Sequence, residues 1–506
     1  MIRKRIAVIL LILLPAILYG SSPRIIEINT RHLTVIYPSE LSSVAADLVC
    51  EAESLISSFV NFMQYEPAAR ITLRVVMPEN SGICPDILVL SGGISAIDVE
   101  ALQGPDSRLF LSEILFKKYM ELFSANFGAI PGINDRMLSG LRDYIISGID
   151  DKSIMQLNDY RVNISDREVS VKDENLPYFI PCFFWDYITR TFSKNAAAES
   201  LKDAAYFGEF FNSLCRFTGK NEKEIFKGFW IFLEGYLNPG KSEQYDEIAG
   251  LTDKPYNIIS YCSSSGGKNL VLVAELDSDY YLFSVQDGKA TGSDVKSSHG
   301  DIKPSSVAVS IDGIVVAGYD RFGSVLICFD AAGGKILWEK EFPLIYINHI
   351  HADTQGAGIL FSAEVNGQSS IFLYDMKSVA IIKTENEGVD LIYPSFTGSG
   401  HVLYVRRGNV QSLVIFDMAT ASVEEIYRTP NTICKPSVDP AGRILFSESV
   451  KGATNIRCID LSAGTADQFT YGSTANINPL IIKGRLYFLN YFKGRFRPVS
   501  LDSYHK

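Results

Sequence analysis

The sequence predicts a multidomain protein: a mixed α/β and then α-helical N-terminal domain, followed by an all-β, six-bladed β-propeller. Two observations support this prediction. The C-terminal half repeats a short strand that ends in a turn, whereas the N-terminal half shows strand periodicity followed by helical periodicity. A chain of 506 residues is long enough for two or three domains.

The repeat in the C-terminal half is regularly spaced. The intervals between its turn residues are 46, 45, 42, 43 and 40 residues, and these residues are Ser284, Asp330, Asp375, Asp417, Asp460 and Ser500. A repeat of about 40–45 residues made only of short strands is typical of propeller blades. One blade cannot bury both of its faces, so we expect six blades to stack in a ring. We expect the aspartates among these residues to bind backbone N–H groups of their turns.

The propeller is expected to span residues 244–506. Its last repeat reaches Lys506 soon after a third strand, which leaves no sequence for a fourth. The segment Ile248–Thr252 resembles the outer-strand segment Gln468–Thr470. We therefore expect a strand from about residues 246–252 to complete the last blade and remove an unpaired edge.

The N-terminus has the pattern of an export signal. Basic residues Arg3, Lys4 and Arg5 precede an apolar run from Ile6 to Leu18. This run is short for a membrane span, so residues 1–22 are predicted to be a signal peptide and the protein to be periplasmic or secreted. The alternative is an uncleaved segment, which would tether the chain to a membrane. The net charge of −11 argues against nucleic acid as a partner.

Residues 24–243 are predicted to form the N-terminal domain. Strands are expected at residues 32–37, 71–76 and 86–90, and helices at residues 42–65, 107–123, 137–146, 179–192, 201–218 and 222–237. The polar stretch from Asp150 to Asn175 is expected to be an extended hairpin or loop.

This order of elements resembles the gluzincin type of zinc metallopeptidase. The segment Leu138–Tyr144 is similar to the family's S-E-G-L-A-E-Y segment, and Phe217-Thr218-Gly219 resembles the turn before its last helix. The resemblance implies a zinc hydrolase fold in which two His residues one helical turn apart flank a catalytic Glu.

The residues that would perform this chemistry are missing. Ser112 and Phe116 occupy the positions of the two His ligands, Ser139 occupies that of the third ligand, and only Glu113 matches. No His occurs between His32 and His299, so no change of register restores the zinc site. We therefore expect no catalytic residues, no metal and no cofactor: a pseudoenzyme in which these four positions are vestigial. The alternative is an unrelated α/β domain, with Glu113 as a solvated helix residue.

The blades resemble those of TolB-type propellers. The clearest match runs from Lys435-Pro436-Ser437 through Ile444–Ser447 to Cys458–Leu461. It follows the pattern P-x-W-S-P-D-G, with Val438 in place of the Trp, Asp439 in place of the Ser and Ala441 in place of the Asp. The resemblance implies a WD40-like architecture and protein partners in the bacterial envelope.

The binding residues that we predict lie in the propeller. His349 and His351 are two apart on an expected strand and are predicted to line the central channel, whereas Tyr319, Arg321, Arg406 and Arg407 lie in loops suited to protein contacts. The leading hypothesis is a non-catalytic exported protein that binds envelope or extracellular macromolecules. One alternative is a hydrolase, acting on peptide or glycan through carboxylates in the channel or at the domain junction. A second is a carbohydrate or cell-wall binder.

Overall fold

The computed structural model describes the greater part of the chain. The described residues are 25–39, 42–76, 87–90, 94–98, 107–163, 172, 176–237, 245–248, 251, 254–263, 270–286, 289–295, 302–320, 323–330, 334–343, 345–352, 358–365, 368–383, 389–398, 400–439, 441–461 and 465–501. The expected signal peptide and Arg321 lie outside them. No helix in this described part is both long and apolar enough to cross a membrane.

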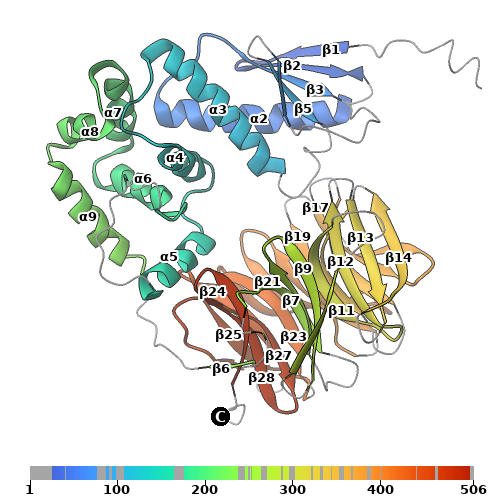
Figure 1. The fold of residues 1–506 in the computed structure, drawn as a ribbon. Coiled ribbons are helices and arrows are strands. Elements are labelled where there is room, and N and C mark those ends of the chain that lie inside the picture. Colours follow the sequence, from blue (N-terminus) through green and yellow to red (C-terminus); the bar gives the residue numbers. More distant parts are fainter. Residues whose placement is uncertain are drawn as a thin grey trace, which may run out of the picture. The chain divides into compact units, whose positions relative to one another are not determined.

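The chain divides into two compact units. The first comprises residues 1–146 and 188–222, and the second comprises residues 147–187 and 223–506. The second unit therefore contains helical residues as well as the propeller. The fold is an N-terminal α/β and then helical region followed by a six-bladed propeller, as the sequence predicts (Figure 1).

The first unit contains a mixed five-stranded sheet in the order β1-β2-β3-β5-β4. Its strands are β1 (Ile25–Asn29), β2 (Leu33–Pro38), β3 (Ile71–Val76), β4 (Ile87–Leu90) and β5 (Ile94–Asp98). The β2-β3 and β3-β5 pairs are parallel, whereas β1 and β4 pair antiparallel at the two edges. Leu33, Val35 and Leu73 are buried, in agreement with the alternation of the sequence.

Helices α2 (Ser42–Met63), α3 (Ser107–Phe127) and α4 (Asp135–Ser147) follow the predicted positions closely. Aromatic side chains form much of the packing between α2 and α3, where the rings of Phe59 and Phe116 meet edge to face at 5.2 Å. The helix expected at residues 201–218 is instead two helices, α7 (Lys194–Phe207) and α8 (Phe210–Thr218), because Gly208 adopts a φ of 131° that ends α7.

Helices α5 (Asp151–Asn163), α6 (Ile180–Thr191) and α9 (Glu222–Glu234) fall wholly or largely in the second unit. The extended structure expected from Asp150 to Asn175 is therefore wrong at its start, where α5 forms. The Asp150 carboxylate accepts a hydrogen bond of 2.7 Å from the backbone N–H of Ser153, which caps the helix.

Six four-stranded antiparallel sheets form the propeller, and each is numbered here as a blade from the first strand onward. The blades are blade 1, β7 (Asn257–Ser263), β8 (Leu270–Leu276), β9 (Asp279–Gln286) and β10 (Lys289–Asp294); blade 2, β11 (Lys303–Val309), β12 (Ile314–Asp320), β13 (Gly323–Phe329) and β14 (Ile336–Pro343); blade 3, β15 (Tyr346–Ala352), β16 (Ile359–Val365), β17 (Gln368–Tyr374) and β18 (Val379–Lys383); blade 4, β19 (Asp390–Phe396), β20 (His401–Arg407), β21 (Gln411–Asp417) and β22 (Val423–Thr429); blade 5, β23 (Thr432–Val438), β24 (Ile444–Val450), β25 (Ala453–Asp460) and β26 (Thr465–Gln468); and blade 6, β27 (Asn476–Ile482), β28 (Arg485–Phe492), β29 (Arg495–Leu501) and β6 (Asp246–Glu247).

A separate apolar core fills the space between each blade and the next. Val315 and Ala317 of β12 enter the core between blades 2 and 3, whereas Val316 enters the core between blades 1 and 2. Successive side chains of a strand point to opposite faces, so a continuous apolar run buries both faces of the blade. The last blade is completed by β6, in which Asp246 and Glu247 pair with Ser500 and Val499.

Asp side chains at the ends of third strands bind their turns, as predicted. The carboxylate of Asp375 accepts a hydrogen bond of 2.7 Å from the backbone N–H of Ser378, and that of Asp417 accepts one of 2.8 Å from Ala419. Hydrogen bonds from Ser378 and Lys377 hold the pKa of Asp375 below its usual value. These carboxylates therefore serve the turns.

Helix α5 packs on blades 5 and 6. Its buried Asp159 accepts hydrogen bonds of 2.7 Å from the backbone N–H groups of Lys493 and Gly494, in the turn between β28 and β29. The Ile154 side chain lies against Gly452, in the turn between β24 and β25. These turns lie at the rim where the innermost strands begin, so α5 covers part of that rim.

Candidate functional site

The innermost strand of every blade carries an irregularity at the same place. The register with the second strand skips Ile259, Ser305 and Asn348 in blades 1 to 3, and it skips an X-Pro pair in each of blades 4 to 6: Tyr393-Pro394, Lys435-Pro436 and Asn478-Pro479. Such a β-bulge kinks the strand and changes the direction of its side chains. The six bulges surround the axis of the ring.

The bulges of blades 4 to 6 have an unusual backbone. Tyr393, Lys435 and Asn478 have φ values of 55°, 33° and 58°. Residues other than Gly rarely adopt a positive φ, and a residue that precedes Pro normally has an extended backbone. Because three blades share this conformation, the bulge belongs to the architecture, whereas the side chain at the bulge differs from blade to blade.

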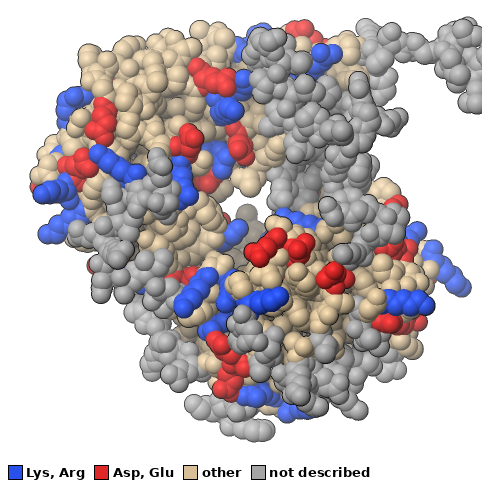
Figure 2. Space-filling view, viewed as in Figure 1, with Lys and Arg blue, Asp and Glu red and all other residues tan. Residues whose placement is uncertain are grey.

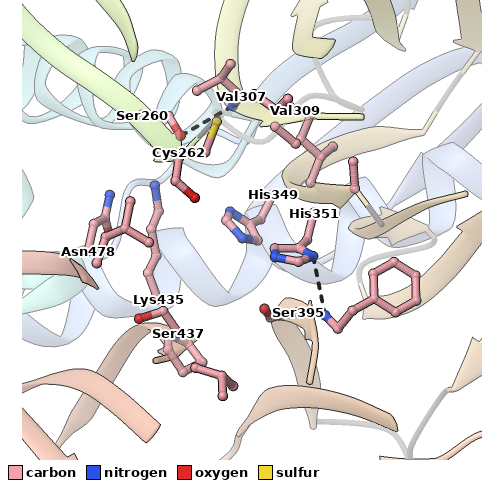
Figure 3. A pocket seen from close by; sticks show the side chains of 18 of the residues that line it. Ser260, Cys262, Val307, Val309, His349, His351, Ser395, Lys435, Ser437 and Asn478 are labelled. Carbon is pink, nitrogen blue, oxygen red and sulfur yellow. Dashed lines mark hydrogen bonds between the residues drawn. The ribbon is translucent and has the colours of Figure 1, made fainter. Parts of the chain in front are cut away.

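A cavity of about 870 Å³ lies in the propeller channel and is lined by residues from all six innermost strands. It extends from the bulges to the ends of these strands and to the turns that carry Gly398, Gly400 and Met418. The polar side chains that line it include Ser260, Cys262, His349, His351, Ser395, Lys435, Ser437 and Asn478, which Figure 3 shows around one open space.

The two histidines of β15 are held by neighbouring blades. The Nδ1 atom of His351 accepts a hydrogen bond of 3.3 Å from the backbone N–H of Phe396 in blade 4. His349 Nδ1 lies 3.3 Å from the hydroxyl of Ser306 in blade 2, and that hydroxyl accepts a hydrogen bond from the backbone N–H of Ile350. Burial, then the charges of Lys435 and His351, lower the pKa of His349 well below its usual value. His349 is therefore neutral at physiological pH.

Lys435 supplies the positive charge of the cavity. Its side chain extends from the bulge of blade 5 into the open space that His349 and His351 also face (Figure 3). Burial lowers the pKa of this ammonium from 10.5 to about 8. The described residues provide its Nζ with neither a hydrogen bond nor an ion pair. The Lys435 ammonium is thus enclosed by protein, is charged at neutral pH and faces the open volume of the cavity.

The thiols at the cavity are poor nucleophiles. Burial raises the pKa of Cys262 to about 12 and that of Cys434, the neighbour of Lys435, to about 11. Only the thiolate attacks or binds a metal ion effectively, so both groups behave as small neutral side chains near neutral pH. In the described part of the chain, no group of three or more His, Cys, Asp or Glu is placed to hold a metal ion.

The structure separates the predicted binding residues into two groups. His349 and His351 line the cavity, as expected. Tyr319 and Arg407 lie instead at the rim where the innermost strands begin, since they pair with Lys303 and Asp390 at the starts of β11 and β19. Arg406 directly precedes Arg407 on β20. Arg407 forms an ion pair of 2.8 Å with Asp390.

The four vestigial positions lie in the first unit. Ser112 is buried on α3 and its hydroxyl donates a hydrogen bond of 2.6 Å to the carbonyl of Leu109. Phe116 is buried against Phe59, whereas Glu113 is exposed, with its carboxylate 3.8 Å from Arg142. Ser139 is exposed on α4. Two of these side chains therefore serve the packing of α3.

Sequence reasoning missed Lys435, Ser437 and Asn478 as cavity residues. The signal was present, because the Pro residues of blades 4 to 6 recur at the start of each repeat. A bulge reverses the expected direction of side chains, so alternation along the strand could not show that Lys435 faces the channel.

Charge on the surface is mixed. Figure 2 shows Lys and Arg side chains interspersed with Asp and Glu on the visible face. Nucleic-acid binding usually needs basic residues gathered into one patch or stripe, and the described residues show no such stripe on this face.

No family model and no curated protein matches this chain. Among solved structures, the chain is similar to an oligogalacturonate lyase from Vibrio parahaemolyticus, at 13% identity and a TM-score of 0.35 over 51% of this chain and 95% of that chain. It is also similar to the β-propeller domain of the Trilobed protease from Pyrococcus furiosus, at 14% identity and a TM-score of 0.35 over 49% and 82% of the two chains. TolB from Acinetobacter baumannii matches at 14% identity and a TM-score of 0.33 over 55% and 68%.

These likenesses concern the fold alone. The C-terminal part of the chain is a six-bladed propeller that resembles those of TolB and oligogalacturonate lyase. These similar structures do not test the metallopeptidase resemblance of residues 24–243, which stays a prediction.

Proposed function

We propose that the chain is a non-catalytic, exported protein that binds a protein partner of the bacterial envelope and holds a segment of it in the propeller channel. The observation that supports this most directly is the cavity of about 870 Å³, whose lining comes from all six blades. Ligand sites are concave, of about 300–1,000 Å³, and largely apolar with a few placed polar groups. Here the apolar part includes Val307, Val309 and Phe396, and the polar part is the set of side chains given above.

The first unit has a supporting role in this proposal. A metallopeptidase-like domain that had lost its ligands would keep the fold and use the former site for packing. The buried positions of Ser112 and Phe116 fit that history, since one bonds its own helix and the other packs on Phe59. In this proposal the unit adds binding surface.

The test compares the wild-type protein with a variant whose channel is obstructed. Ser263 lines the cavity at the end of β7, so Ser263→Trp places a large ring there. Ile336→Trp, on the exposed outer strand of blade 2, is the matched control. We expect arrays of envelope-derived peptides to bind the wild type and the control and to lose binding to the Ser263→Trp variant.

Two results would contradict the proposal. Binding that survives Ser263→Trp would place the interaction elsewhere. Turnover of a bound peptide or glycan, abolished by one Asp or Glu substitution, would instead establish the hydrolase alternative.

A further inference from the structure

The Lys and His side chains that line the cavity are basic, and no carboxylate lies among the described lining residues. Among the described lining residues there is one Lys and two His, and there is no Asp, Glu or Arg. His349 is held neutral by burial and by its basic neighbours, so Lys435 carries the positive charge near neutral pH. A partner in this cavity meets a single ammonium surrounded by neutral donors.

The fold does not require that ammonium. The same bulge is occupied by Tyr393 in blade 4 and Asn478 in blade 6, which shows that neutral side chains satisfy the positive φ and the following Pro. An enclosed ammonium that has no hydrogen-bond or ion-pair partner among the described residues destabilises the folded state. A residue that opposes folding and is not needed by the architecture points to a ligand.

We propose that the channel recognises a carboxylate, and that its partner inserts an acidic peptide segment whose Asp or Glu side chain pairs with Lys435. This inference rests on the proposed function for the identity of the partner as a protein segment. The charge complementarity itself stands on the lining residues.

A carboxylate fits this cavity better than a phosphate. Phosphate sites generally use Arg forks, helix N-termini or nests of backbone N–H groups, and carry more than one positive charge. Here one ammonium matches one negative charge. Apolar neighbours such as Val307, Val309 and Phe396 suit the methylene stem that carries a side-chain carboxylate.

The imidazoles add neutral donors. Because Nδ1 of His351 accepts the N–H of Phe396, a neutral ring carries its proton on Nε2. Figure 3 shows that second nitrogen on the side of the ring toward the open space. For His349, the Ser306 hydroxyl already accepts from Ile350 and can donate its own proton to Nδ1, so the proton of the neutral His349 ring lies on Nε2.

The net charge of −11 sharpens the specificity. Long-range repulsion disfavours acidic ligands over most of the surface. An acidic segment therefore binds only where it can reach a local cation. We expect the Lys435 contact to distinguish acidic partners from neutral ones.

The test uses the full chain and two dye-labelled peptides that alternate Gly with Glu or Gly with Gln. Binding is followed by fluorescence anisotropy near neutral pH and physiological salt. A charged hydrogen bond contributes about tenfold to a hundredfold in affinity, so we expect the wild type to prefer the Glu peptide by at least about tenfold. The variant K435M should lose this preference and K435R should keep it.

The matched control is Lys340→Met, which removes one exposed Lys of β14 and changes the net charge equally. Free succinate should displace the Glu peptide, whereas inorganic phosphate at the same concentration should not. Equal binding of the two peptides by the wild type, absence of binding to both, or a preference that survives in K435M would overturn the proposal. Stronger displacement by phosphate would overturn the carboxylate assignment.

The two proposals fail in distinguishable ways. If array binding is lost in Ser263→Trp but Glu and Gln peptides bind equally, the channel binds partners and the acidic class is wrong. If array ligands are absent but succinate raises the melting temperature of the wild type and not of K435M, the carboxylate site holds and the macromolecular partner is wrong.

Discussion

The phenolic hydroxyl of Tyr261, on the innermost strand of blade 1, donates a hydrogen bond to the backbone carbonyl of Asn478 on the innermost strand of blade 6. The same hydroxyl lies 3.1 Å from the carbonyl of Tyr487. Burial raises the pKa of this phenol well above its usual value, so the hydroxyl keeps its proton. The first and last blades are therefore joined by a buried side chain beside the cavity, in addition to the strand pairing of β6 with β29.

We expect Tyr261→Phe to lower the free energy of unfolding by about 1–3 kcal/mol, because the buried carbonyl of Asn478 loses its donor. Tyr471→Phe is the control: its hydroxyl donates to the carbonyl of Gln468 at 3.2 Å, but the side chain is 53% exposed. Urea unfolding followed by circular dichroism measures both. Equal stability of the two variants would show that the Tyr261 contact does not hold the ring.

The closing strand should matter through its buried neighbour. Ile248, directly after β6, is 7% exposed and belongs to the core between blades 6 and 1. Ile248→Ala should destabilise the protein by about 2–5 kcal/mol through loss of burial and an unfilled cavity. Ile336→Ala, on the exposed β14, should change stability by less than about 0.5 kcal/mol.

Opening the ring should also promote self-association of the protein. Loss of β6 would expose the edge of β29, and exposed edges pair with other chains. Size-exclusion chromatography of Ile248→Ala should therefore show more oligomer than Ile336→Ala. A monomeric Ile248→Ala protein of unchanged stability would contradict the role assigned to this segment.

Removing the channel charge should stabilise the protein. The pKa of Lys435 is lowered from 10.5 to about 8. Below about pH 8 both folded and unfolded states are protonated and the destabilisation is fully present. Between about pH 8 and 10.5 the unfolded state holds a proton that the folded state has released, so stability rises with pH. At about 1.4 kcal/mol per pKa unit, the destabilisation near neutral pH is about 3.5 kcal/mol at most.

Thermal melts of K435M and wild type across this pH range check the sign. We expect K435M to be the more stable protein near neutral pH, and its advantage to shrink as pH rises from about 8 toward 10.5. A less stable K435M at neutral pH would mean that the ammonium is paired in solution. K340M should follow the wild-type curve.

Binding of the Glu peptide should weaken above about pH 8 in the wild type. The titratable groups that line the cavity with Lys435 are His349, His351, Cys262 and Tyr261, and Cys434 is its neighbour in the sequence. Burial raises the pKa of Tyr261 well above its usual value, so the phenol keeps its proton in this window. Both thiols stay protonated in this window, since their pKa values are raised to about 12 and 11, and His349 is already neutral. Loss of the Lys435 proton is therefore the change that we expect to weaken binding. The pH profile of K435M should be flat there; a parallel decline in both proteins would assign the effect to another group.

The docking of helix α5 on the propeller should depend on the carboxylate of Asp159. Asp159→Ala removes the acceptor of two backbone N–H groups at 2.7 Å and should destabilise the docking of α5 by about 1–3 kcal/mol. Asp151→Ala is the control, because Asp151 is exposed and accepts one longer bond of 3.2 Å from Thr432. Hydrogen exchange of α5 amides should accelerate in the first variant only.

Helix α5 also shows where sequence reasoning fails. Its mixed polar composition gave no apolar stripe, and an extended hairpin or loop was expected. Asn158 and Asp159 are buried. The Asn158 amide donates a hydrogen bond to the carbonyl of Ile154 in the same helix, whereas the partners of Asp159 come from elsewhere. For Asp159 these are N–H groups in a turn more than 300 residues later. A helix whose buried face is satisfied by such distant donors has no local hydrophobic signature.

The candidate site divides in the same way. His349 and His351 could be assigned to the channel because they lie on a repeated innermost strand. Lys435 could not, since its direction depends on a bulge that the alternating pattern does not encode. Tyr319 and Arg407 were grouped with the histidines as binding residues, but they lie at the rim where the innermost strands begin.

The sequence by itself determined the number of blades, the strands and the ring, because each blade is a local unit whose period and alternation are written in about forty consecutive residues. It also determined that residues 33 to 298 contain no His. Only the tertiary structure decided which side chains meet at the axis. Closure of the ring brings six strands, spread over more than 200 residues, around one open volume. The bulge of blade 5 directs the Lys435 side chain into that volume. Such proximity arises from non-local packing, which no local pattern records.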